Sequence, residues 1–122
     1  MSKKIKYDKK KADILFSLLI REAGQCFKCT NTYRLQCAHI ITRGYFGTRW
    51  DIQNAVCLCS GCHVFFTYHP IEWEDFTDEK FGVELRPLLK QRARDYTKSG
   101  RKPDYLTICE ELEGQLTLPL DK

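Results

Sequence analysis

Two cysteine pairs constrain this chain more than any other feature of its sequence. The segments CFKC and CSGC each separate two thiols by two residues, and about thirty residues lie between the segments. Each tight turn can present two thiolates to one ion, and two such turns complete a tetrahedral shell of sulfur. We therefore expect a structural zinc ion, whose binding free energy would stabilise a small core. The expected ligands are Cys26, Cys29, Cys59 and Cys62.

Three further cysteines lie outside this pattern. The total of seven is odd, so a framework made only of disulfides would leave one thiol unpaired. A redox pair is not favoured either, because no βαβ pattern surrounds the CxxC segments. Cys37 and Cys57 lie on expected strands, and the simplest interpretation is that they are small core residues. The third cysteine, Cys109, has no role that the sequence indicates. Cys57 could take the place of Cys59 in a CxC arrangement, but Cys59 gives the better pair.

The length and composition are those of one soluble domain. With 122 residues, 43% of them hydrophobic and 30% charged, the chain can build a modest core. It has no apolar run of the roughly 20 residues that a membrane span needs. The apolar stretch at 14–20 is short and lacks a cleavage site, so it predicts a buried helix rather than a signal peptide. We expect an intracellular, cytoplasmic protein without membrane contact.

Charge is distributed unevenly along the chain. The net charge is +4, but residues 1–11 contain six lysines against one aspartate, and residues 84–102 contain seven Lys or Arg against two acids. Between them, residues 71–80 contain five acids against one lysine. Two basic segments around an acidic one are typical of a protein with one phosphate-facing side, and solvated surface is the alternative interpretation.

The predicted elements form a small α+β domain that spans residues 1–122. A helix is expected at 8–23, where apolar residues share one face and Gly24 ends the pattern. Strands at 34–41 and 54–58 flank a polar loop at 42–53. Further helices are expected from 60 or 61 to 68, at 71–81, at 84–98 with Pro87 in the first turn, and at 105–113 after Asp104 as the cap. Residues 1–6 are expected to form a flexible basic tail.

The segments around the cysteine pairs resemble the HNH (ββα-metal) nuclease motif with zinc knuckles. The resemblance rests on CFKC, LQCAHIITRG and TRWDIQNAVCLCSGCH, and it covers residues 26–70. It implies a zinc-stabilised HNH core with a helix before it and a helical part at 71–115 after it. The fuller pattern also resembles small phage-type HNH proteins, some of them associated with recombination.

The resemblance implies roles for three side chains. In the family, one His ends the first strand, an Asn precedes the second strand and a last His opens the helix, and these positions are His39, Asn54 and His63 here. A neutral imidazole can take a proton from water at pH 7, so His39 is expected to be the general base. His63 would bind a catalytic divalent ion such as Mg²⁺ or Mn²⁺, and Asn54 would bind that ion or pin the loop that orients His39. The products would carry 5′-phosphate and 3′-hydroxyl groups.

One position departs from the family pattern. Many members carry Asp or His directly before the first His, where it binds the catalytic ion, and this chain has Ala38. A ligand is therefore missing or comes from elsewhere in the chain. The candidates are Asp51, Asn54 and His69, with Cys37 as a poorer one, and the position of His69 before Pro70 is more typical of surface.

Basic side chains near the expected cleft are candidate phosphate contacts. Arg43 and Arg49 lie in the loop at 42–53, and Arg49 could instead pair with Asp51 and stack on Trp50. Residues of the basic helix would extend the footprint, together with the N-terminal lysines, without reading the base sequence. These residues are Lys90, Arg92 and Arg94.

The sequence thus predicts a metal-dependent endonuclease acting on DNA. One alternative is a structure-selective nuclease of phage recombination that cuts branched DNA. The other is a zinc-held DNA-binding module that has lost catalysis, with Ala38 as the trace of that loss. The expected partners are DNA, a second copy of the chain in a homodimer, or a phage replication, recombination or packaging protein.

Overall fold

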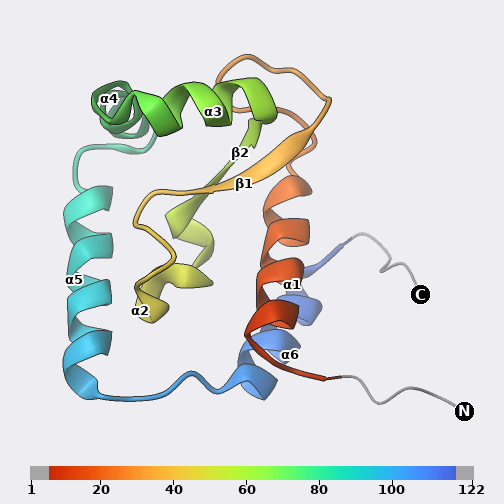
Figure 1. The fold of residues 1–122 in the computed structure, drawn as a ribbon, viewed down its shortest axis with the longest axis vertical. Coiled ribbons are helices and arrows are strands. Elements are labelled where there is room, and N and C mark those ends of the chain that lie inside the picture. The colour runs from red at the N-terminus through yellow and green to blue at the C-terminus, as the bar shows by residue number, and fades with distance from the viewer. Residues whose placement is uncertain (1–5, 118–122) are drawn as a thin grey trace, which may run out of the picture.

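A two-stranded antiparallel sheet lies at the centre of the fold, with helices packed against both faces (Figure 1). The computed structural model describes residues 6–117. The predicted α+β class is confirmed, because this part of the chain forms helices and one small antiparallel sheet. The elements in chain order are α1 (Lys9–Arg21), β1 (Leu35–His39), α2 (Phe46–Arg49), the 3₁₀ helix η1 (Ile52–Asn54), β2 (Ala55–Cys59), α3 (Ser60–Tyr68), α4 (Pro70–Phe81), α5 (Leu85–Ser99) and α6 (Tyr105–Gln115).

The register of the sheet decides which side chains share a face. Leu35 of β1 lies opposite Cys59 of β2, and His39 at the other end lies opposite Ala55. Because side chains alternate along a strand, the even-numbered residues face one layer and the odd-numbered residues face the other. The end of β1 therefore carries His39 on the face that packs against α1, where its ring lies 5.5 Å from the ring of Phe16.

Each face of the sheet supports its own hydrophobic cluster. The first cluster joins Ala38, Val56 and Leu58 to buried residues of α3 and α5, and Trp73 and Phe76 of α4 pack against it. The second cluster lies between α1 and α6, and Cys37 and Ala55 of the sheet pack against it. Its buried members are Ala12, Leu15, Phe16, Cys109 and Leu112. Figure 1 shows the consequence, with α1 and α6 on one side of the molecule and α5 on the other.

Local sequence explains where the helices begin and end. The Asp8 carboxylate accepts a hydrogen bond from the backbone N–H of Lys11, and Asp104 caps α6 in the same way through Thr107. Pro70 occupies the first turn of α4, where its missing N–H costs nothing, and Gly100 ends α5 with a φ of 69°. The helices that the sequence predicts are all present, with ends that differ from the expected ones by one or two residues.

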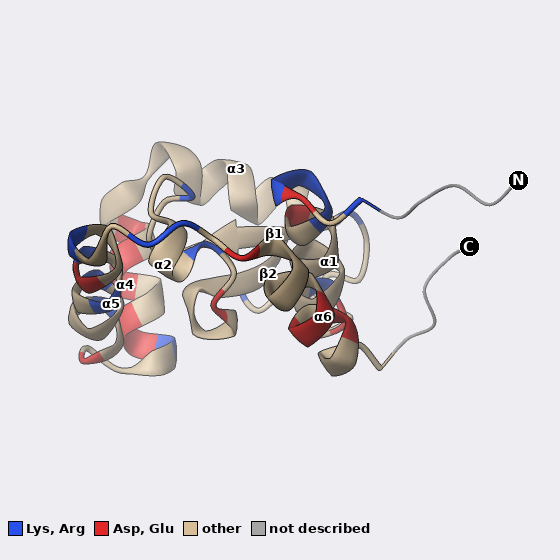
Figure 2. Ribbon diagram, turned by 90° about the horizontal axis from the view of Figure 1, so that it is seen from below, with Lys and Arg blue, Asp and Glu red and all other residues tan. Residues whose placement is uncertain are grey.

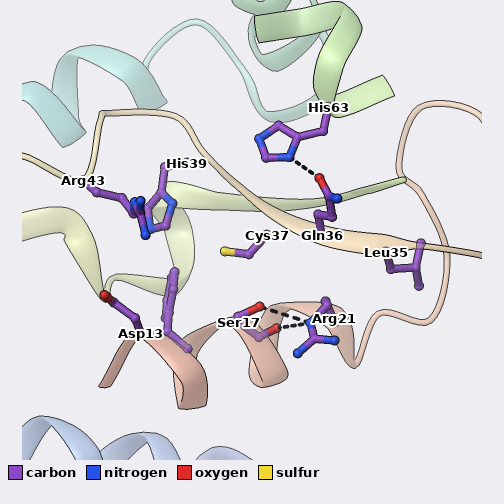
Figure 3. Close-up of a pocket in the computed structure, with 10 residues that line it drawn as sticks. Asp13, Ser17, Arg21, Leu35, Gln36, Cys37, His39, Arg43 and His63 are labelled. Carbon is purple, nitrogen blue, oxygen red and sulfur yellow. Dashed lines mark hydrogen bonds between the residues drawn. The ribbon is translucent and has the colours of Figure 1, made fainter. Parts of the chain in front are cut away.

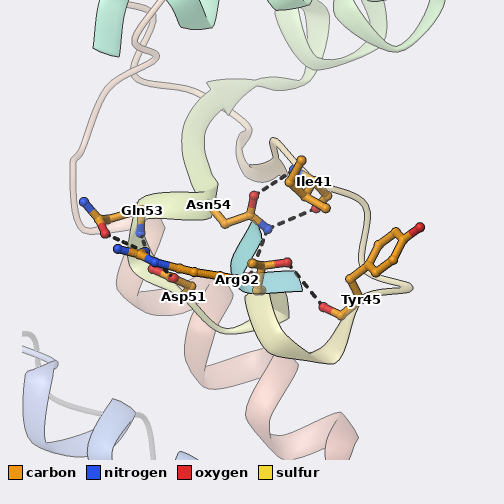
Figure 4. Close-up of polar contacts among 7 residues, drawn as sticks. Ile41, Tyr45, Asp51, Gln53, Asn54 and Arg92 are labelled. Atoms are coloured by element: carbon orange, nitrogen blue, oxygen red, sulfur yellow. Dashed lines mark hydrogen bonds and ion pairs between the residues drawn. The ribbon is translucent and has the colours of Figure 1, made fainter. Parts of the chain in front are cut away.

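The segment at 42–53 differs from its prediction as a plain loop. It contains α2 and most of η1, because buried contacts hold it against the rest of the molecule. A Cβ atom on Gly47 would collide with the side chain of Tyr96, so only glycine allows α2 to lie this close to α5. The side chain of Asn54 adds the polar contacts that Figure 4 shows.

Two further expectations concern the chain as a whole. Within residues 6–117, no helix is both long enough and apolar enough to cross a membrane. The flexible tail expected at 1–6 lies, apart from Lys6, outside the part of the chain that the structure describes.

Candidate functional site

Four cysteines from distant parts of the chain meet at one end of the sheet. Cys26 and Cys29 lie in the turns between α1 and β1, whereas Cys59 ends β2 and Cys62 lies in the first turn of α3. Their sulfur atoms all lie within 4.8 Å of one another, and the Sγ atoms of Cys29 and Cys59 are 3.6 Å apart. A tetrahedral zinc site with bonds of about 2.3 Å separates its sulfurs by roughly 3.8 Å. This group could therefore hold a metal ion such as zinc.

The thiols of this group do not ionise alike. Burial opposes ionisation of Cys26, but backbone N–H groups outweigh it and lower the pKa of this thiol to about 6. Burial and the neighbouring sulfurs instead raise the pKa of Cys62 far above its ordinary value. One sulfur is thus ready to bind a cation, and the positive charge of a bound cation would favour loss of the other protons. Cys57, the alternative ligand considered from the sequence, does not belong to the group.

His39 is held in one orientation by the backbone. Its Nε2 lies 2.9 Å from the carbonyl oxygen of Arg49, and because a carbonyl can only accept, this nitrogen carries the hydrogen. The lone pair of the neutral ring is therefore on Nδ1. Burial, together with the charges of Arg43 and Arg49, lowers the pKa of His39 despite the bond to the carbonyl. At pH 7 the ring is neutral, which is the state that a general base needs.

His63 approaches the same region from the first turn of α3. Its Nδ1 lies 2.7 Å from Oε1 of Gln36 on β1, so this nitrogen donates and Nε2 retains the lone pair. Burial lowers the pKa of His63 below its ordinary value. Both predicted histidines are thus neutral, and each has one ring nitrogen fixed by a hydrogen bond to an oxygen.

A cavity of about 660 Å³ brings the two histidines together (Figure 3). α1 forms one wall of the cavity with Asp13, Ser17 and Arg21, and the opposite side consists of β1 residues, Arg43 and His63. Cys37 also faces this cavity, but burial raises the pKa of its thiol to about 12, so it stays protonated. Arg21 and the acid Asp13 were not expected here, because no local pattern in α1 relates them to a strand end that is some twenty residues away.

Asn54 acts on the loop rather than on the cavity. Its side chain is fully buried, and its Oδ1 accepts a hydrogen bond from the N–H of Ile41. Its amide nitrogen donates to the carbonyl oxygens of Ile41 and Thr48 (Figure 4). Of the two roles that the sequence left open, these contacts are those of a residue that pins the loop leading to Arg49. None of the cavities that contain His39 includes Asn54.

The five predicted nucleic-acid contacts divide into two groups. Arg43, Lys90 and Arg94 are exposed and line cavities at the surface. Arg49 and Arg92 instead form ion pairs, with Nη to carboxylate distances of 2.7 Å to Asp13 and 2.8 Å to Asp51. The sequence interpretation that paired Arg49 with Asp51 was wrong about the partner, although Arg49 does lie over the Trp50 ring at 5.6 Å.

A second, catalytic ion has no set of ligands among the described residues. The four cysteines form the one group of metal-binding side chains in residues 6–117. Ala38 offers no donor atom, and the thiol of Cys37 stays protonated. Of the candidate ion ligands, His63 and the protonated Cys37 line the cavity with His39.

The other candidate ligands are engaged elsewhere. Asp51 accepts hydrogen bonds from Arg92 and from the backbone N–H of Gln53. His69 donates from Nδ1 to the carbonyl oxygen of Phe65 and stacks on that ring at 4.2 Å, away from the cavity. The side chains present therefore do not fit a resident catalytic ion.

The charged segments form separate patches rather than one face. Figure 2 shows acidic residues along α4 and α6 and basic residues at the start of α1 and on α5. Because α1 and α5 lie on opposite sides of the molecule, the loop after β1 runs between the two basic segments.

Comparison of the chain with protein-family models, with curated proteins and with solved structures gave no match.

Proposed function

We propose that this chain is an endonuclease that hydrolyses phosphodiester bonds of DNA, with His39 as the general base. The observation that supports this proposal is the setting of the His39 ring. One nitrogen is tied to a carbonyl, the other carries a lone pair, and the ring lines a cavity that also contains His63 and two arginines. This is the arrangement that a base needs when it activates water beside an anionic substrate.

The chemistry follows from the side chains of the cavity. Nδ1 of His39 takes a proton from water, and the resulting hydroxide attacks phosphorus. The guanidinium groups of Arg21 and Arg43 stabilise the negative charge that gathers on the phosphoryl oxygens. The bond from phosphorus to the 3′ oxygen breaks, and this oxygen takes a proton from solvent. The products carry 5′-phosphate and 3′-hydroxyl groups, as the resemblance to HNH nucleases implies.

We also propose that the four-cysteine group holds a structural zinc ion. The cysteines join the turns after α1 to the end of β2 and the start of α3, so a bound ion would hold these three segments together at one end of the sheet. All four positions of a tetrahedral ion would be filled by sulfur, which leaves none for water or substrate. Zinc would then support the fold and take no part in cleavage.

Cleavage of DNA tests the nuclease proposal. Zinc-loaded protein is incubated with supercoiled, linear, nicked and four-way-junction DNA, either without another metal or with added Mg²⁺ or Mn²⁺. We expect cleavage by the wild type and a loss of about a hundredfold or more in His39→Ala. His69→Ala is the matched control, because His69 also has one nitrogen on a carbonyl but lies outside the cavity. Preferred cutting of the junction would indicate the branched-DNA nuclease.

A second function is favoured by the missing ion ligands. Ala38 and the engaged states of the other candidates are what a DNA-binding module without catalysis would show. If the wild type binds these DNAs and cuts none of them with any metal, this second function replaces the first. Cleavage without added metal would instead assign the charge-stabilising role to the arginines.

A further inference from the structure

Three hollows lie next to one another on the surface, because neighbouring hollows share lining residues, and we call the path along them the groove. The cavity of about 660 Å³ and a second hollow of about 220 Å³ share His39 and His63. The second hollow and a third of about 270 Å³ share Ile40 and Thr42. The groove therefore runs from α1, across the end of β1, to α5, and Figure 1 shows the loop after β1 lying between these two helices.

Both ends of the groove carry positive charge. Arg21 and Arg43 line the end at α1, and Lys90 and Arg94 line the end at α5. All four side chains are exposed, and none of them belongs to an ion pair within residues 6–117. The one carboxylate along the groove, that of Asp13, is occupied by Arg49 and Trp50. The groove thus suits a polyanion that extends over its whole length.

Beyond the end at α1, the groove also has apolar and aromatic lining. The second hollow is lined by Leu58, Phe66 and Trp73 among others, and the third has Ile40 and Ile41 beside the ring of Tyr45. The Tyr45 ring has no ring contact among the described residues and is 46% exposed, so one of its faces can receive a flat group. Duplex DNA stacks its bases inside and presents phosphates, whereas a single strand presents both phosphates and free base faces.

We propose that this groove binds a single-stranded segment of nucleic acid. Phosphates lie on Arg21 and Arg43 at one end and on Lys90 and Arg94 at the other, and a base beside Lys90 and Arg94 stacks on Tyr45. The proposal rests on the proposed function, because His39 lies in the groove and the bond to be cut then belongs to the unpaired segment. A strand end, a flap or the unpaired part of a branch has this chemistry.

Binding measured without cleavage tests the groove. The zinc-loaded His39→Ala variant is titrated into a fluorescein-labelled oligothymidylate of about ten nucleotides, a length within the usual site sizes for single strands, and into a blunt duplex of the same length. Fluorescence anisotropy gives the two dissociation constants at several salt concentrations. We expect the single strand to bind at least about tenfold more tightly than the duplex. Equal or tighter binding of the duplex would overturn the proposal.

Two further variants separate the charged ends from the stacking position. In the same background, Lys90→Ala with Arg94→Ala should weaken binding about tenfold and flatten the slope of log K against log salt by about 1.4, or about 0.7 for each lost phosphate contact. Tyr45→Ala should weaken binding roughly five- to a hundredfold and leave the slope unchanged. All three residues are exposed, so circular dichroism should show an intact fold.

The matched control removes the same amount of charge outside the groove. Lys98→Ala with Lys102→Ala takes away two exposed cations of the same part of the chain, and binding should change by less than about threefold. If this control weakens binding as much as the groove variant does, attraction to the whole basic segment explains binding and the groove does not. Because no cleavage is required, this result stands whether or not the wild type cuts DNA.

Discussion

Removing the carboxylate of Asp13 should destabilise the protein more than its place on a surface helix suggests. Asp13 receives two hydrogen bonds from the guanidinium of Arg49, at 2.9 and 2.7 Å, and a third from the indole of Trp50 at 2.9 Å. The side chain of Arg49 is 12% exposed and that of Asp13 is 26% exposed, so water reaches this pair only in part. In Asp13→Ala the guanidinium of Arg49 keeps the backbone carbonyl oxygen of Arg43 as a hydrogen-bond acceptor.

The loss of stability that we expect in Asp13→Ala follows from how deeply the Asp13–Arg49 pair is buried. Breaking a fully buried pair costs about 3–5 kcal/mol, because one charge is left uncompensated, whereas an exposed pair contributes about 0–1 kcal/mol. For a pair that is largely but not fully buried we expect a loss of about 2–3 kcal/mol in the free energy of unfolding. For a chain of this size, the melting temperature would fall by roughly 10 °C.

A double-mutant cycle measures the pair itself. Urea unfolding at a fixed zinc concentration is compared for wild type, Asp13→Ala, Arg49→Ala and the double variant, and we expect a coupling energy of about 2 kcal/mol. The Asp51–Arg92 pair is the control, because the Arg92 side chain is 38% exposed against 12% for Arg49, and its coupling should be about 1 kcal/mol or less. Equal coupling energies for the two pairs would refute the argument from burial.

Asp13→Ala should also disturb the tautomer of the His39 ring. The side chain of Arg49 is anchored by Asp13, and the backbone carbonyl of Arg49 accepts the hydrogen bond from Nε2 of His39. Nitrogen chemical shifts of the ring report which nitrogen carries the hydrogen. We expect a single tautomer in the wild type and in the Asp51→Ala control, and a mixture in Asp13→Ala. A ring that keeps one tautomer in Asp13→Ala would show that Asn54 alone fixes the loop.

Three further predictions address other parts of the molecule. The purified protein should contain one zinc per chain, and Cys59→Ser should lose both the metal and, by circular dichroism, much of its helix signal. Proton NMR titration should place the pKa of His39 below its ordinary value, because burial disfavours the charged ring; the stability from this residue is therefore complete above about pH 6.5 and is lost as the pH falls through the lowered pKa. Gly47→Ala should cost about 1–3 kcal/mol, since its new methyl group meets Tyr96, whereas Gly61→Ala, with open space around it, should cost almost nothing.

Features that depend on local spacing could be predicted from the sequence. The two CxxC turns, the cap at Asp104 and the periodicity of the helices each involve residues a few positions apart. The cysteines could be matched across the chain because a metal shell requires four ligands, and each turn supplies two. The interest of His39 and His63 came instead from the resemblance to the HNH motif, and both residues line one cavity.

Features that depend on distant partners could not be predicted in this way. Asp13 and Arg49 are 36 residues apart, and nothing near either of them indicates that they pair. Arg92 likewise faces Asp51, 41 residues away, because α5 packs against α2, which ends just before Asp51. A sequence shows which arginines exist, whereas only the packing of α1 and α5 decides which of them are engaged and which, like Arg94, remain exposed.

The packing of α1 on α6 has a consequence for the order in which the protein forms during synthesis. Phe16 of α1 contacts the ring of His39 and belongs to the same buried cluster as Cys109 and Leu112 of α6. When the ribosome has released the cysteine turns, the sheet and α3, the segment that completes this cluster has not yet emerged. A nascent chain can therefore bind metal through its cysteines before α1 is fixed beside His39 as a wall of the cavity, and α6 completes this packing when it emerges.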